Sequence, residues 1–203
     1  MENVVSAMKT NDKWIAAFEA GHLIIARLVG REIDKVSLEI VDGKRGCFYR
    51  PINEAAWDDW KEHLCLLAGP KAQIEVCPES ILEEKLAVFR EKIIQDTENR
   101  YQIPAIYNCT GWQHDILPVY EYLCMPDAPV DWQNFGLSRR QLITNVEKSL
   151  TSFFAEIVVK AAVVDIAKNL SKVRTLSGGE ATEFVQAAGL FEIPAVMNFL
   201  TRP

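Results

Sequence analysis

One stretch of the chain combines residue types and a spacing that could do chemistry, and it lies between Trp14 and Leu28. In the motif H-E-x-x-H, two histidines four residues apart project from one face of a helix onto a zinc ion, and the glutamate acts as a general base. Here Glu19 and His22 stand at the second and last positions, but Phe18 stands at the first. A phenyl ring has no lone pair for a metal. The stretch is therefore a zinc-binding motif that lacks one ligand.

A helix must carry these residues, and the sequence predicts it over about residues 12–29, with Thr10 or Asn11 as its cap. Its apolar residues recur at helical spacing. This spacing places Phe18 and His22 on one face, directed toward the interior of the protein.

A β-hairpin is predicted directly after this helix. Residues 33–41 and 46–51 alternate in part between apolar and polar side chains, and an Asp-Gly turn separates them. The remainder of the chain indicates helices, supported by four capping-box patterns. These helices are expected at about residues 53–76, 80–95, 110–124, 138–169 and 177–188.

The predicted fold class is mainly α with a small β-hairpin, in a single domain over residues 1–203. The motif helix and the hairpin occupy residues 10–51, the helical remainder residues 53–188, and a loose tail residues 189–203. A loop is expected at about 125–137, between the predicted helices at 110–124 and 138–169.

Composition excludes several classes of function. The chain of 203 residues has a net charge of −6, which argues against a nucleic-acid or anionic-membrane partner, because both require a basic face. No apolar run approaches the roughly 18 residues of a membrane span. The five cysteines are scattered and form no C-x-x-C pair, which is typical of reduced thiols. We therefore expect a cytoplasmic protein.

Several motifs occur in an order that resembles the peptidase domain of the FtsH family of ATP-dependent zinc metalloproteases. Each motif is weak alone, and the order carries the resemblance, which covers about residues 12 to 186 and includes no ATPase module. The similar segments are 17–22 (AFEAGH), 33–38 (IDKVSL), 67–72 (LAGPKA), 110–115 (TGWQHD) and 175–181 (TLSGGEA).

The resemblance implies roles for three positions and a helical, zincin-related fold. His22 corresponds to the second histidine ligand and Asp115 to the aspartate ligand of that family's zinc. Glu19 corresponds to the base that deprotonates the metal-bound water. Phe18 occupies the position of the first histidine ligand.

A catalytic zinc requires about three protein ligands and an open position for water. His22 and Asp115 supply two, so a third would have to come from His114, Cys109 or His63. His114 directly follows Gln113 and precedes Asp115, and neighbouring helical residues point about 100° apart, which disfavours it. Without a metal, a direct contact between His22 and Asp115 is expected in its place.

Three functions are compatible with this pattern. The first is a catalytically inactive relative of the metallopeptidases that binds a peptide or a protein partner, with strand addition at the hairpin edge as one mode. The second is an active zinc-dependent peptidase or other hydrolase with a rearranged metal site. The third is a structural subunit that associates with copies of itself. We expect the first, with no bound cofactor; zinc belongs only to the second.

Overall fold

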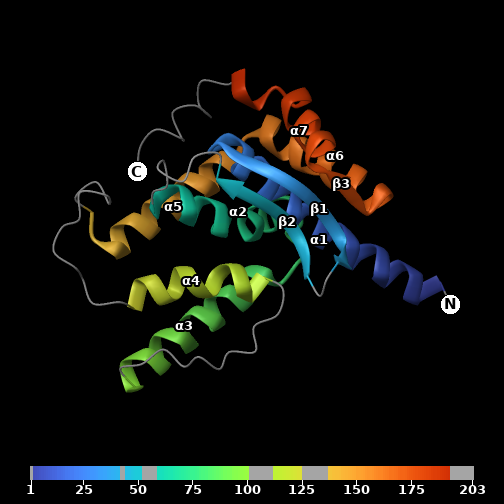
Figure 1. Cartoon of the computed structure of the whole chain (residues 1–203). Coiled ribbons are helices and arrows are strands. Elements are labelled where there is room, and N and C mark those ends of the chain that lie inside the picture. Colours follow the sequence, from blue (N-terminus) through green and yellow to red (C-terminus); the bar gives the residue numbers. More distant parts are fainter. Residues whose placement is uncertain (1, 42–43, 52–58, 101–111, 125–136, 193–203) are drawn as a thin grey trace.

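A computed structural model describes residues 2–41, 44–51, 59–100, 112–124 and 137–192 (Figure 1). As predicted, this part of the chain is mainly helical with a small sheet. None of its helices is long and apolar enough to cross a membrane. The elements are α1 (Glu2–Leu28), β1 (Arg31–Val41), β2 (Lys44–Pro51), α2 (Asp59–Val76), α3 (Leu82–Arg100), α4 (Trp112–Cys124), α5 (Arg139–Ala155), α6 (Ile157–Val173), β3 (Thr175–Ser177), α7 (Gly178–Ala187) and a short 3-10 helix (Leu190–Glu192).

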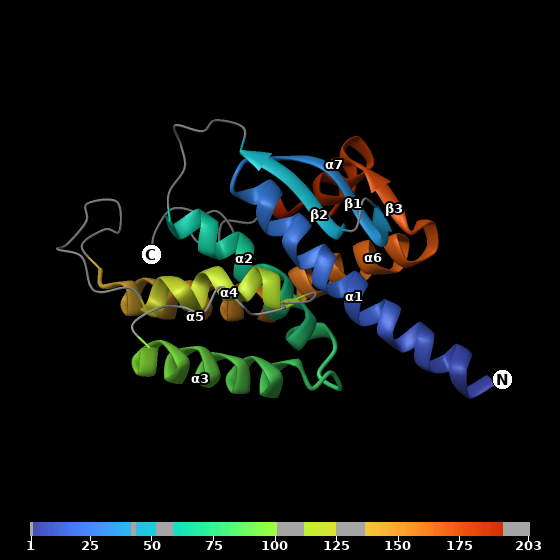
Figure 2. The same cartoon turned by 60° about the horizontal axis from the view of Figure 1, so that its bottom comes forward.

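Helix α1 is the centre of the fold. Every residue from Ala16 to Ala26 is buried, so this half of the helix is covered on all sides. Figure 2 shows the sheet on one side of α1 and α2 on the other. The helix begins at Glu2, so the prediction of a cap at Thr10 or Asn11 was wrong. The preceding residues contain neither Gly nor Pro, and nothing in them ends a helix.

The sheet has three antiparallel strands in the order β2-β1-β3. The predicted hairpin is present, and the short β3 adds to its other side. Cys47, Val36 and Leu176 pair across the three strands and form one row of side chains. Strand β3 was not predicted, because three residues between two helices are too few to show an alternating pattern.

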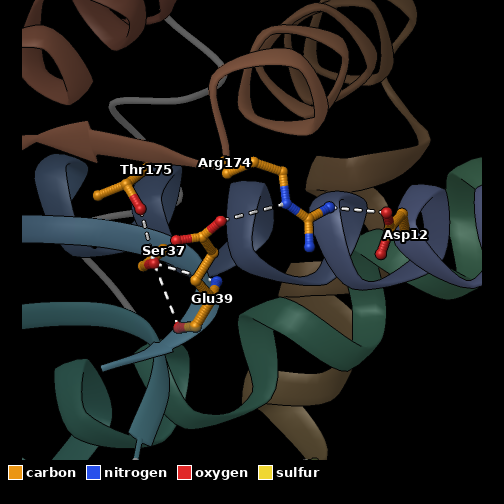
Figure 3. A network of polar contacts seen from close by, with 5 residues as sticks. All are labelled: Asp12, Ser37, Glu39, Arg174 and Thr175. Atoms are coloured by element: carbon orange, nitrogen blue, oxygen red, sulfur yellow. Dashed lines mark hydrogen bonds and ion pairs between the residues drawn. The ribbon is translucent and has the colours of Figure 1, made fainter. Parts of the chain in front are cut away.

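A network of polar contacts links α1 and the start of β3 to strand β1 (Figure 3). Arg174 reverses the chain between α6 and β3 with a positive φ of 67°. Its guanidinium contacts the carboxylates of Asp12 in α1, at 2.7 Å, and Glu39 in β1, at 4.0 Å. The hydroxyl groups of Ser37 and Thr175 lie 2.8 Å apart. These contacts keep an unfavourable backbone conformation in place.

The predicted long helix at 138–169 is two helices, because the chain is extended at Glu156 (φ −62°, ψ 130°). The buried positions change at the break. In a continuous helix, the stripe that includes Phe154 would continue at Ile157 or Val158, yet Ile157 is 86% exposed. The break lets Val159 begin the buried stripe of α6 instead. No Gly or Pro marks this position in the sequence.

Two of the predicted capping boxes are present at helix starts, those of Ser138 with Gln141 and of Ser177 with Glu180. The box predicted at Ser80 is not formed: the Ser80 Oγ atom is buried without a hydrogen-bond partner among the described residues. Helix α3 begins two residues later, at Leu82. The box predicted at residue 110, the loop at 125–136 and the tail from 193 lie outside the described residues.

Candidate functional site

The site is built where the N-terminal turn of α4 meets the buried half of α1. Asp115 lies in the first turn of α4, and its Oδ2 atom is 3.7 Å from the Nε2 atom of His22. The imidazole is buried, whereas about a third of the Asp115 side chain is exposed. The separation suits an ion pair and is too long for a hydrogen bond. The structure thus brings together two residues that lie 93 positions apart in the chain.

The second nitrogen of His22 fixes how the ring is turned. Its Nδ1 atom lies 2.8 Å from the carbonyl oxygen of Cys65 in α2 and donates a hydrogen bond to it, since a carbonyl can only accept. With Nδ1 committed to α2, Nε2 is the nitrogen that faces Asp115. A carbonyl that orients a histidine in this way is also the usual support of a metal-binding imidazole.

Phe18 lies beside His22 on the same face of α1. The two ring centroids are 4.7 Å apart and the planes meet at 71°, an edge-to-face arrangement. The phenyl ring is buried. At the position where the resemblance implies a first metal ligand, the site therefore presents an apolar ring to the imidazole.

The charges around His22 favour its protonated form. Burial alone lowers the pKa of the imidazole, but the Asp115 and Glu19 carboxylates and the Cys65 carbonyl together raise it above the ordinary value of 6.5. A protonated imidazole has no lone pair left on Nε2. The protonated imidazole can form an ion pair with Asp115 but cannot bind a metal through Nε2.

Glu19 is buried beneath strand β2. A Cβ atom added to Gly46 would lie 3.4 Å from Glu19 Oε2, so the strand backbone passes close over this carboxylate. Cys47 follows in β2 and is partly buried. Burial raises the pKa of the Cys47 thiol, and the carboxylates of Glu19 and Asp115 raise it further. The thiol is therefore protonated at neutral pH and is a poor nucleophile.

Cys47 was not among the residues singled out from the sequence. The hairpin was predictable, but no sequence signal indicates which of its residues lies over Glu19. That position depends on how β2 crosses α1, which is a property of the packed fold.

The proposed substitute ligands do not join His22 and Asp115 in the described part of the chain. The ring of His63 packs against Tyr122, at a centroid distance of 4.5 Å, two helical turns beyond Asp115 along α4. The side chain of His114 and the whole of Cys109 lie outside what the structure describes.

The converging residues do not fit a catalytic zinc centre. Among the described residues, no three His, Cys, Asp or Glu side chains are grouped so that they could hold a metal ion. His22 and Asp115 make two donors, and Phe18 places carbon where a third would be needed. No family model matches the chain, and no curated protein matches it by sequence. The geometry of the site must therefore carry the functional argument.

Proposed function

We propose that this protein is a catalytically inactive relative of the zinc metallopeptidases that acts by binding a peptide or protein partner. One observation supports the proposal: His22 and Asp115, for which the resemblance implies zinc-ligand positions, form an ion pair with each other, and Phe18 packs against the imidazole. A zinc ion polarises a carbonyl and lowers the pKa of its bound water. The described residues offer no equivalent for either effect.

The proposal includes a fold like the FtsH peptidase domain. Two features of the structure support it. The helix with the E-A-G-H residues packs against the helix with the L-A-G residues, and Asp115 reaches His22 from a third helix. The small sheet also follows the motif helix directly. The approach of Asp115 to His22 and the strands that follow the motif helix are what the resemblance implies.

The site has no other evident route to hydrolysis. Glu19 could act as a general base only on a water that something else activates. The Cys47 thiol has a raised pKa because of burial and the nearby carboxylates, so it is not poised as a nucleophile. A binding role requires neither group to react.

Strand β2 is the surface that we assign to binding. It lies at one edge of the sheet in the order β2-β1-β3, so among the described strands its outer side has no partner. An edge strand of eight residues offers backbone N–H and C=O groups to an extended segment, which can add as a further strand. Gly46 places this strand directly over Glu19.

A peptidase assay tests the absence of catalysis. The protein is incubated with an unfolded substrate such as casein, with and without added zinc, beside the Glu19→Gln variant. We expect no zinc-dependent cleavage and no difference between the two proteins, because the site lacks a third ligand. Zinc-dependent proteolysis that Glu19→Gln abolishes would contradict the proposal. It would indicate a hydrolase whose site is completed by a residue such as Cys109 or His114.

A further inference from the structure

Two glycines mark the closest approach of α1 and α2, and they differ in what they face. A Cβ atom on Gly21 of α1 would lie 2.5 Å from the Cβ of Ala72 and 2.7 Å from the carbonyl oxygen of Ala68. A Cβ atom on Gly69 of α2 would overlap the Nε2 atom of His22 and lie 2.9 Å from Cε1 of Phe18. Gly21 therefore faces only α2, whereas Gly69 faces the two rings of the site.

The position of Gly69 follows from helix geometry. Cys65 and Gly69 are four residues apart, so they lie one above the other on the same face of α2. The imidazole of His22 spans this turn: Nδ1 donates to the Cys65 carbonyl at 2.8 Å, and Nε2 occupies the space that a Cβ atom at position 69 would need. One turn of α2 thus fixes Nδ1 by a hydrogen bond and leaves space at Gly69 for Nε2, which has no hydrogen-bond partner among the described residues.

The imidazole has little room to retreat from a larger residue at position 69. His22 is 5% exposed, and Phe18 packs against one side of its ring. A rotation that carried Nε2 away from position 69 would also break the hydrogen bond from Nδ1 to Cys65. A buried carbonyl left without its donor costs about 1–3 kcal/mol.

We propose that Gly69 is a positioning residue of this site. Because residue 69 has no side chain, the His22 imidazole can lie with Nε2 facing Asp115, and a ring at position 18 can pack beside it. The inference rests on the proposed function only in that it takes Phe18, His22 and Asp115 as the site. It holds whether position 18 carries a phenyl ring or a metal-binding imidazole.

The test compares Gly69→Ala with the matched control Gly21→Ala, in protein labelled with ¹⁵N at histidine. The chain contains three histidines, so the side-chain spectrum is simple. Both variants insert one methyl group between α1 and α2, and both are expected to lower the urea midpoint of unfolding. Only Gly69→Ala is expected to shift the His22 Nδ1 resonance and to expose its proton to exchange. Unchanged His22 signals in Gly69→Ala, or equal shifts in both variants, would overturn the proposal.

A double-mutant cycle keeps the test decisive if Gly69→Ala is too unstable to study alone. In a His22→Ala background, the added methyl group no longer overlaps the imidazole and only its contact with Phe18 remains. The decrease in the urea midpoint caused by Gly69→Ala is therefore expected to be smaller than in the wild-type background. The loss caused by Gly21→Ala is expected to stay the same. If Gly69→Ala costs as much without the imidazole as with it, Gly69 has only a packing role. None of these readouts involves zinc or catalysis, so they can fail independently of the proposed function.

Discussion

Replacing Phe18 with histidine is expected to make the protein bind about one zinc ion per chain. The new imidazole would share the face of α1 with His22, and Asp115 already lies within 3.7 Å of that ring. The three side chains would complete a His-His-Asp set. We expect a dissociation constant of about 1 µM or less, equivalent to about −8 kcal/mol, measured by chelator competition and by mass spectrometry of bound metal.

Two controls define what this result means. Phe18→Leu removes the aromatic ring without adding a donor, so it should bind no zinc. Adding Asp115→Asn to Phe18→His should weaken binding, because an amide oxygen is a poorer ligand than a carboxylate. A folded Phe18→His variant that takes up no zinc would show that the three side chains do not converge as required.

Removing the imidazole of His22 is expected to cost about 3 kcal/mol of the free energy of unfolding. His22→Ala loses a buried ring packed on Phe18 and leaves the Cys65 carbonyl without its donor. Asp115→Asn should cost only about 1 kcal/mol, because the Asp115 side chain is partly exposed and solvent screens the ion pair. Urea unfolding followed by circular dichroism measures both values. If His22→Ala and Asp115→Asn lower the free energy of unfolding equally, this prediction is wrong.

The pH dependence of stability provides the control for the ion pair. The pKa of His22 is higher in the folded protein than its ordinary value of 6.5, so the folded state binds more protons than the unfolded state in this range. The contribution of the pair is therefore complete below about pH 6.5 and is lost as the pH rises through the folded pKa. Wild type should lose stability over that interval, and Asp115→Asn should lose less. If Asp115→Asn does not alter the change of unfolding free energy with pH, the ion pair is not the cause of that pH dependence.

The sequence predicts local structure well where one short pattern is sufficient. The capping boxes at Ser138 and Ser177 are formed, and the two strands predicted on either side of the Asp-Gly pair are antiparallel partners. Where several weak preferences compete, prediction failed. No residue type marks the break at Glu156, after which α6 buries a new stripe that begins at Val159.

The site was predictable only in part. The residues of α1 share one face because of their spacing, and Asp115 was placed beside His22 only through the resemblance of several ordered motifs. The roles of Gly69 and Cys47 had no such signal. Each depends on how closely α2 or β2 approaches α1, and side-chain spacing along one element does not encode the distance between two elements.

The most direct test of this account is the zinc content of the native protein. Protein purified without a metal-binding tag or chelator, and a sample equilibrated with zinc and then desalted, would be measured by mass spectrometry. Because His22 and Asp115 contact each other and Phe18 offers no donor, we predict far less than one zinc per chain in both samples. About one zinc per chain would contradict the account and would require a third ligand from elsewhere in the chain.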